Sequence, residues 1–273
     1  MAKPLRIGII GCGAIAQLSH IPYTMDDEQF ALVALADLSA PLLKAVADRY
    51  GISEAYTDYH ELLARDDIEA VIISHNGSHY ATVMAALEAG KHIFVEKPLA
   101  WNLREIEEIV EQVKHSDQIV QVGYHKLYDP AFPYAKEHLQ KMRDLGFVRI
   151  TVLHPTNELG LSPHRIRRGN GVIIEGHVDP GSWEHQITMQ RQAFAGGDLA
   201  PLVDEALGAD KDNPQLRLVY GHLMISLIHQ IYMMYGFLGE PERVVNAESW
   251  RGGMSIHILV QYPGDLRCSM DWH

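Results

Sequence analysis

The sequence predicts an α/β fold, in which a parallel sheet with helices on both faces is followed by a second, α+β domain. Short continuous apolar runs alternate with helical patterns over the first 125 residues, as expected for strands that are buried on both faces of a parallel sheet. A glycine-rich turn follows the first of these runs. After Gly123 the alternation stops, and strand-like segments close the chain. We therefore expect two domains, residues 1–125 and 126–273.

Five apolar runs define the strands that we expect in the first domain. They are residues 5–10, 30–36, 70–73, 93–95 and 119–122. The clearest intervening helix begins at Asn102, whose side chain can cap its N-terminus while Glu105 reaches back. Strands and helices in alternation build right-handed βαβ units and a doubly wound sheet.

The second domain is expected to mix helices with strands. Helical patterns cover residues 130–145 and 215–238, and strand-like segments cover residues 147–153, 244–250, 255–262 and 266–272. Residues 155–215 are rich in Gly, Pro, Asp and Arg, which predicts loops and short helices. His222, Ser226 and His229 interrupt the long apolar helix at a spacing that places them on one face, which is typical of a buried core helix rather than a membrane span.

Composition and charge exclude several classes of protein. Hydrophobic residues make up 47% and charged residues 21% of the 273 residues, which excludes disordered and fibrous chains. A formal net charge of −12 argues against a surface that binds DNA or RNA. The two cysteines, Cys12 and Cys268, form neither a disulfide framework nor a CxxC metal pattern, which favours a reducing, cytoplasmic location.

The glycine-rich turn has the spacing of a dinucleotide-binding motif. Gly11-Cys12-Gly13-Ala14-Ile15-Ala16 is a G-x-G-x-x-A sequence between a predicted strand and a predicted helix. The first glycine makes the tight turn, the second lets a pyrophosphate approach the backbone, and the final alanine permits close packing. Free N–H groups at the helix N-terminus then face the phosphates. This context predicts a Rossmann domain that holds its cofactor at Gly11, Gly13, Ala14 and Ile15.

Asp37 is the residue that we expect to select the cofactor. It ends the second apolar run, 24 residues after Gly13, where an acidic side chain accepts hydrogen bonds from the ribose hydroxyls and repels a 2′-phosphate. No arginine follows directly, so NAD is favoured over NADP. An alternative role, capping the next helix, is compatible with this one. Cys12 is interpreted as a small filler rather than a redox thiol, because a bound pyrophosphate disfavours a thiolate.

Several further strings resemble one family. Gly90-Lys91-His92 precedes the run at residues 93–95, and Glu96-Lys97-Pro98-Leu99 follows it. Combined with the glycine-rich turn, they resemble the Gfo/Idh/MocA oxidoreductase family. Other matching strings are Tyr50-Gly51-Ile52, Asn76-Gly77-Ser78-His79, residues 123–130 and Leu238-Gly239-Glu240-Pro241. The resemblance is dense across residues 5–130, sparse across 150–215, and returns from about residue 220.

This resemblance implies a fold and an activity. It implies a Rossmann domain followed by a domain with an open, mainly antiparallel sheet. The implied reaction is NAD-dependent oxidation or reduction of a secondary alcohol or carbonyl on a sugar or cyclitol. A homodimer or homotetramer is implied as well. Members of the family usually carry more sheet after the point where this chain stops, so either the second domain is reduced or the sequence is incomplete.

The resemblance also implies roles for single residues. Lys97 would contact a cofactor ribose hydroxyl and the substrate oxygen, and Glu96 would contact the cofactor or hold Lys97. His229 matches the histidine of a family Asp-x-x-x-His motif and would transfer the proton. The aspartate position of that motif is Ile225 here, which departs from the pattern. The nearby Ser226 and His222 could take over part of the carboxylate's role, as could Glu175, Asp179 or Glu184.

The remaining site residues follow the ends of the predicted strands. The expected cofactor contacts outside the glycine-rich turn and Asp37 are Ser74, His75, Asn76, His79, Glu96, Lys97 and His125. The expected substrate contacts are Lys97, His125, Lys126, His222, Ser226 and His229. No metal is expected, because His154, His164, His177, Asp179, Glu184 and His185 match no zinc template. Arg165, Arg167 and Arg168 fit a solvated basic loop better than a site for an acidic substrate group.

Three functions remain compatible with these residues. The leading expectation is an NAD-dependent oxidoreductase of the kind described above. A second is a glycoside-cleaving enzyme that oxidises a ring hydroxyl transiently and uses no net NAD. The third is a sensor of NAD or sugar that has lost catalysis. Ile225 at the aspartate position favours the sensor, whereas the presence of both Lys97 and His229 favours an enzyme.

Overall fold

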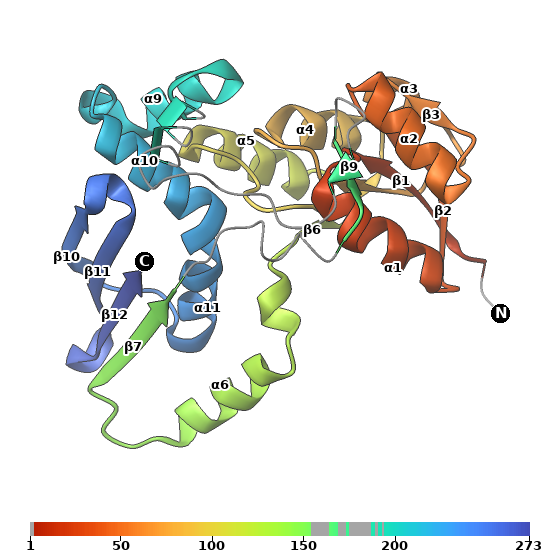
Figure 1. Ribbon diagram of the computed structural model, residues 1–273. Coiled ribbons are helices and arrows are strands. Elements are labelled where there is room, and N and C mark those ends of the chain that lie inside the picture. The colour runs from red at the N-terminus through yellow and green to blue at the C-terminus, as the bar shows by residue number, and fades with distance from the viewer. Residues whose placement is uncertain (1–2, 154–163, 169–172, 175–186, 189–190, 193) are drawn as a thin grey trace. The chain divides into compact units, whose positions relative to one another are not determined.

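The computed structural model, shown in Figure 1, describes residues 3–153, 164–168, 173–174, 187–188, 191–192 and 194–273. The chain divides into two compact units. The first comprises residues 1–123 and 156–180, and the second comprises residues 124–155 and 181–273. The first unit therefore includes a later segment that the sequence analysis assigned to the second domain.

A six-stranded parallel sheet forms the centre of the first unit. Its strands are β1 (Leu5–Ile10), β2 (Phe30–Ala36), β3 (Ala55–Tyr56), β4 (Ala70–Ile73), β5 (His92–Val95) and β6 (Val120–Val122). Their order is β3-β2-β1-β4-β5-β6, and every neighbouring pair is parallel. This is the strand order of a Rossmann fold. The predicted α/β class is confirmed, although the two-residue β3 was too short to be predicted.

Helices join these strands. They are α1 (Ile21–Asp26), α2 (Ala40–Tyr50), α3 (Tyr59–Leu63), α4 (Tyr80–Glu88) and α5 (Leu103–Lys114), and a π turn, η1 (Ala16–His20), precedes α1. Asn102 caps α5 as predicted, because its Oδ1 accepts a hydrogen bond from Glu105 N–H at 2.9 Å. The Glu105 carboxylate reaches the N–H of Trp101 at 3.2 Å. Local capping therefore begins α5 directly after the loop that follows β5.

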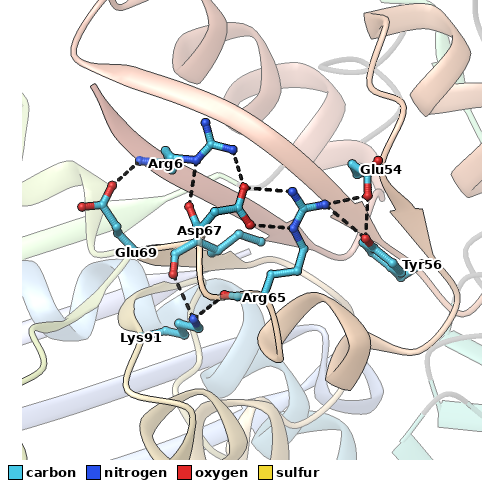
Figure 2. Close-up of polar contacts among 8 residues, drawn as sticks. Arg6, Glu54, Tyr56, Arg65, Asp67, Glu69 and Lys91 are labelled. Atoms are coloured by element: carbon cyan, nitrogen blue, oxygen red, sulfur yellow. Dashed lines mark hydrogen bonds and ion pairs between the residues drawn. The ribbon is translucent and has the colours of Figure 1, made fainter. Parts of the chain in front are cut away.

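Charged side chains pair along the amino-terminal edge of this sheet. Figure 2 shows the Asp67 carboxylate between the guanidinium groups of Arg6 and Arg65, with which it forms ion pairs. The hydrogen bonds with Arg65 and then Arg6 hold the pKa of Asp67 well below its usual range. The Lys91 ammonium donates to the carbonyl oxygens of Arg65 at 2.7 Å and Ile68 at 2.9 Å. Lys91 is only 7% exposed, so these carbonyls replace its water.

The short strand β8 (Ile166–Arg167), paired with β9 (Ile173–Ile174), is bound to the first unit. The Gln17 side-chain amide donates to Arg167 O at 2.9 Å and accepts from Arg167 N–H at 2.9 Å, as a neighbouring strand would. Arg49 Nη1 donates to Arg165 O at 2.7 Å, and Ile166 is buried. These contacts explain why the segment belongs with the first unit. Arg165 and Arg168 are exposed, as expected for a solvated basic segment.

The second unit contains a mainly antiparallel sheet, as predicted. Its strands are β7 (Phe147–Val152), β10 (Arg243–Trp250), β11 (Ser255–Gln261) and β12 (Arg267–Trp272), in the order β10-β11-β12-β7. Only the pair formed by β12 and β7 is parallel. Its helices are α6 (Ala131–Lys141), α9 (Ala200–Leu207), α10 (Pro214–His222) and α11 (Ile228–Leu238), with the short turns η2 (His125–Tyr128), η3 (Gly197–Leu199), η4 (Gly208–Asp210), η6 (Arg251–Gly253) and η7 (Pro263–Asp265).

A π turn interrupts the long helix of the second unit. The segment η5 (Leu223–Leu227) separates α10 from α11. Leu227 packs on the sheet together with Ile256, Met270 and Trp272. Within the part of the chain that the structure describes, no helix has both the length and the apolar character needed to cross a membrane.

Candidate functional site

The two glycines of the glycine-rich turn have different surroundings. Gly11 has a φ of +97°, and a Cβ added there would lie 2.3 Å from His75 N. A side chain at this position is excluded by both backbone conformation and space. A Cβ at Gly13 would meet no described heavy atom within 4 Å. The turn therefore leaves room beside Gly13, where the motif predicts the close approach of a pyrophosphate.

Asp37 connects the end of β2 to this turn. Its Oδ2 accepts a hydrogen bond from Cys12 N–H, and its Oδ1 accepts one from Ser39 N–H, both at 2.8 Å. The cap of α2 is Ser39, whose Oγ accepts from Leu42 N–H. Each carboxylate oxygen can accept a second hydrogen bond. Asp37 is thus held in place by the backbone and can still accept bonds from ribose hydroxyls, which fits the predicted role and NAD.

Cys12 is a buried filler of the turn. Its side chain is fully buried. Burial, and then the negative charge of Asp37, raises the pKa of the Cys12 thiol to about 12. The thiol is therefore neutral at physiological pH and is not a reactive thiolate. This matches the interpretation that the sequence favoured.

The loops that follow β4 and β5 are bonded to each other. The ring nitrogens of His79 lie 2.7 Å from Pro98 O and 2.9 Å from His75 O. Trp101 Nε1 donates to Gly77 O at 3.1 Å. Burial lowers the pKa of His79, although the carbonyl oxygens favour the protonated ring. His79 is only 2% exposed, and its ring therefore connects the loop after β4 to the loop after β5.

Two more predicted cofactor residues lie on the loop after β4. Ser74 Oγ donates to Gly11 O at 2.9 Å, which ties this loop to the glycine-rich turn. His75 Nδ1 lies 2.9 Å from Asn76 O, and its Nε2 lies 2.9 Å from Thr82 Oγ1. The predicted residues Ser74, His75, Asn76 and His79 thus form one bonded segment beside Gly11.

Glu96 and Lys97 begin the loop after β5. Glu96 Oε1 pairs with His20 Nε2 at 2.9 Å, and Oε2 accepts from Lys97 N–H at 3.2 Å. Burial raises the pKa of Glu96, but the bonds with His20 and Lys97 outweigh it, so the net shift is downward. Lys97 is half-buried and its bond to Pro98 is cis. Glu96 therefore holds the backbone of Lys97, whereas His20 is a partner that the sequence analysis did not identify.

A second cluster of titratable side chains lies within the second unit. His229 Nδ1 is 2.8 Å from Tyr232 Oη, and the His229 ring meets the edge of the His125 ring at a centroid distance of 5.0 Å. Lys126 N–H donates to Tyr232 Oη at 3.3 Å. The predicted residues His125, Lys126 and His229 are therefore brought together. The sequence analysis missed Tyr232, although its position three residues after His229 on a helix was a usable signal.

His222 and Ser226 have different neighbours from His229. Trp272 Nε1 donates to Ser226 Oγ at 3.1 Å, and the His222 ring lies 4.6 Å from the Trp272 ring. Both side chains are buried, and the His222 ring also contacts Met254 Sδ at 3.3 Å. The expected common face assumed α-helical spacing, which the π turn η5 disrupts. Substrate contacts by these two residues stay a prediction, and their packing role is what the structure supports.

Several residues of the metal alternative lie outside the described residues. These are His154, His177, Asp179, Glu184 and His185, and Glu175, which was considered as a substitute for the carboxylate at Ile225, lies outside them as well. Among the residues that the structure does describe, no group of three or more His, Cys, Asp and Glu side chains is arranged to hold a metal ion.

Comparison with known proteins identifies the family. Residues 5–124 match the model of the Gfo/Idh/MocA oxidoreductase family, which has an NAD-binding Rossmann fold. A myo-inositol 2-dehydrogenase of Thermotoga maritima is 29% identical over 213 residues, or 76% of this chain and 62% of that protein. An inositol 2-dehydrogenase/D-chiro-inositol 3-dehydrogenase of Shouchella clausii is 38% identical over 141 residues, or 50% of this chain and 40% of that protein. The chain thus spans less than two thirds of the length of these relatives.

Solved structures support the fold. The crystal structure of myo-inositol 2-dehydrogenase from Lactobacillus plantarum has a TM-score of 0.71 at 19% identity, covering 99% of this chain and 70% of that chain. A probable dehydrogenase from Thermotoga maritima has a TM-score of 0.70 at 21% identity, covering 98% of this chain and 68% of that one. Together with the glycine-rich turn and Asp37, the family match leads to one conclusion. Residues 5–124 are an NAD-binding Rossmann domain of the Gfo/Idh/MocA oxidoreductase family.

Proposed function

We propose that the protein is an NAD-dependent oxidoreductase that acts on a secondary alcohol or carbonyl of a cyclitol or sugar. The open space at Gly13, with a backbone-held carboxylate at Asp37, is the observation that carries this proposal. The inositol dehydrogenases among the relatives favour a cyclitol substrate. When bound, NAD supplies the hydride acceptor or, in its reduced form, the hydride donor.

The first unit supplies the residues for cofactor binding. Gly11 makes the turn, and Gly13 leaves room for the pyrophosphate beside the N–H groups of Ala14 and Ile15. Asp37 accepts hydrogen bonds from the ribose hydroxyls, and its negative charge disfavours a 2′-phosphate. Because Cys12 N–H and Ser39 N–H both donate to this carboxylate, it is oriented before the cofactor binds.

Lys97 and His229 are the residues to which we assign catalysis. The ammonium of Lys97 would stabilise negative charge on the substrate oxygen. The Glu96 carboxylate fixes the Lys97 backbone through its N–H and is itself fixed by His20. His229 would take the hydroxyl proton during alcohol oxidation and return it during carbonyl reduction. Its partners in the second unit are Tyr232 and His125.

The test is the absorbance of reduced nicotinamide on mixing the protein with NAD and a panel of inositols, sugars and their acids. We expect at least one cyclitol to reduce NAD and expect NADP to be used less well. His229→Ala should abolish most of this activity, whereas Tyr235→Phe, at an exposed tyrosine on the same helix, should leave it intact. NAD binding without reduction by any substrate, and without oxidation of NADH by the matching ketones, would contradict the proposal.

The same preparation tests two related expectations. Cleavage of a chromogenic glycoside without net NADH would favour transient oxidation instead. A homodimer or homotetramer, implied by the resemblance, predicts a mass of two or four chains by light scattering, and a mass of one chain would contradict it.

A further inference from the structure

We propose that Tyr232 is the positioning residue for His229 and takes the role of the carboxylate that the family motif places at Ile225. The inference rests on the proposed function, because it concerns the same proton transfer. Its geometry lies entirely within the second unit.

The hydroxyl of Tyr232 is the direct partner of the His229 ring. The two residues are three positions apart on α11, so their side chains share one face. Tyr232 Oη lies 2.8 Å from His229 Nδ1, and the two rings meet at 75° with centroids 5.5 Å apart. Ile225, by contrast, is 41% exposed and apolar. The orienting bond to Nδ1 therefore comes from the residue three positions after the histidine.

Two contacts hold Tyr232 in place. Its side chain is 8% exposed, and its ring packs against the Tyr124 ring at 36° with centroids 4.6 Å apart. Lys126 N–H donates to its oxygen at 3.3 Å. Tyr124 directly precedes η2, and Lys126 lies within it. The phenol is thus fixed at its ring and at its oxygen, as a positioning group must be.

The base role assigned to His229 requires the neutral ring to carry its proton on Nδ1 and to leave Nε2 bare. The phenol oxygen of Tyr232 has two acceptor positions, so it can accept from His229 Nδ1–H as well as from Lys126 N–H. A carboxylate would hold the proton on Nδ1 in the same way.

The tyrosine also accommodates the protonated ring. When Nε2 has taken the alcohol proton, Nδ1–H still donates to the Tyr232 oxygen, so the proton transfer requires no change in this bond.

The test reads the tautomer of His229 directly, without substrate. The protein is labelled with ¹⁵N-histidine, and the His229 signals are assigned by their loss in His229→Gln. We expect neutral His229 to show a protonated, hydrogen-bonded Nδ1 and a bare Nε2. In Tyr232→Phe, which keeps the ring and its contact with Tyr124, the two nitrogens should shift toward a mixture of tautomers. In Tyr232→Asp, the proton should remain on Nδ1.

Kinetics provide the second readout. Tyr232→Phe should lower kcat about tenfold with little change in KM, and Tyr235→Phe is the matched control. Identical His229 shifts in wild type and Tyr232→Phe, or a wild-type proton on Nε2, would overturn the inference. Absence of turnover with every substrate would instead refute the proposed function and leave the ¹⁵N result to decide the role of Tyr232.

Discussion

The two edges of the parallel sheet in the first unit differ in how their polar groups are used. At the amino-terminal edge, Asp67 pairs with both Arg6 and Arg65, and Lys91 donates to two carbonyl oxygens. At the carboxyl-terminal edge, Gly13 borders open space and Asp37 keeps acceptor capacity. The first edge stabilises the fold, and the second is arranged for a ligand, as in other open α/β sheets.

Gly11 and Gly13 lie in the same turn, but we expect Gly11 to contribute to fold stability and Gly13 to cofactor binding. Substitutions at these two glycines are expected to have the largest effects. Gly11→Ala puts a Cβ 2.3 Å from His75 N at a φ of +97°, so we expect a loss of about 3 kcal/mol or more in unfolding free energy. Gly13→Ala should leave the unfolding free energy nearly unchanged and weaken NAD binding about tenfold or more. Urea unfolding and calorimetric NAD titration measure both. Equal stability of the two variants would contradict the comparison.

Lys91 tests the amino-terminal edge. Lys91→Met removes two charge-assisted hydrogen bonds from an ammonium that is 7% exposed. We expect it to lower the unfolding free energy by about 2–3 kcal/mol without changing the Kd for NAD. The control is Lys44→Met, because Lys44 is exposed and pairs only across one helical turn with Asp48. A weaker NAD affinity at unchanged stability would show that this edge serves the ligand.

Asp37 tests the carboxyl-terminal edge. We expect Asp37→Ala to weaken NAD binding by roughly tenfold to a hundredfold, because hydrogen bonds to a charged group are lost. The preference for NAD over NADP should also decrease, since the carboxylate that repels a 2′-phosphate is gone. Asp58→Ala is the matched control, because Asp58 also accepts a backbone N–H, at His60, with no cofactor role. Unchanged Kd values for both dinucleotides would contradict the assignment.

The smallest effect is expected at Asp67, and it depends on pH. Hydrogen bonds from Arg65 and Arg6 hold the pKa of Asp67 below its usual value. A carboxyl with a lowered folded-state pKa stabilises the fold above its unfolded pKa of about 3.9 and loses this contribution as the pH falls further. Asp67→Asn should therefore lower Tm slightly at pH 7, and less so in high salt. This difference should shrink in acid, and a difference that grows on acidification would contradict the sign.

Much of the first unit could be predicted because its signals are local. The apolar runs became β1, β2, β4, β5 and β6, and Asn102 caps α5 as its position indicated. The two-residue β3 has too few residues to produce a pattern. The assignment of β8 could not be predicted, because it depends on contacts such as Gln17 with Arg167 that join residues 150 positions apart.

The candidate site shows the same limit. Gly11, Gly13 and Asp37 were predicted because a turn with positive φ and an acid at a strand end leave a fixed spacing in the sequence. The pairing of His20 with Glu96 has no such fixed spacing in the sequence, so it could not be predicted. The prediction that His222, Ser226 and His229 share one face assumed a continuous α-helix. The π turn η5 interrupts that helix, and residue spacing alone does not indicate it.

The sequence by itself thus determined the α/β class and the glycine-rich turn, and it predicts the preference for NAD. These follow from backbone conformation and continuous burial, which depend on neighbouring residues. The tertiary structure decided which polar atoms meet. The hydroxyl of Tyr232 lies against His229 Nδ1, and the N–H of Lys126 reaches it from over a hundred positions away. Such bonds depend on how distant segments pack, because a hydrogen bond is lost when its two atoms move apart by about an ångström.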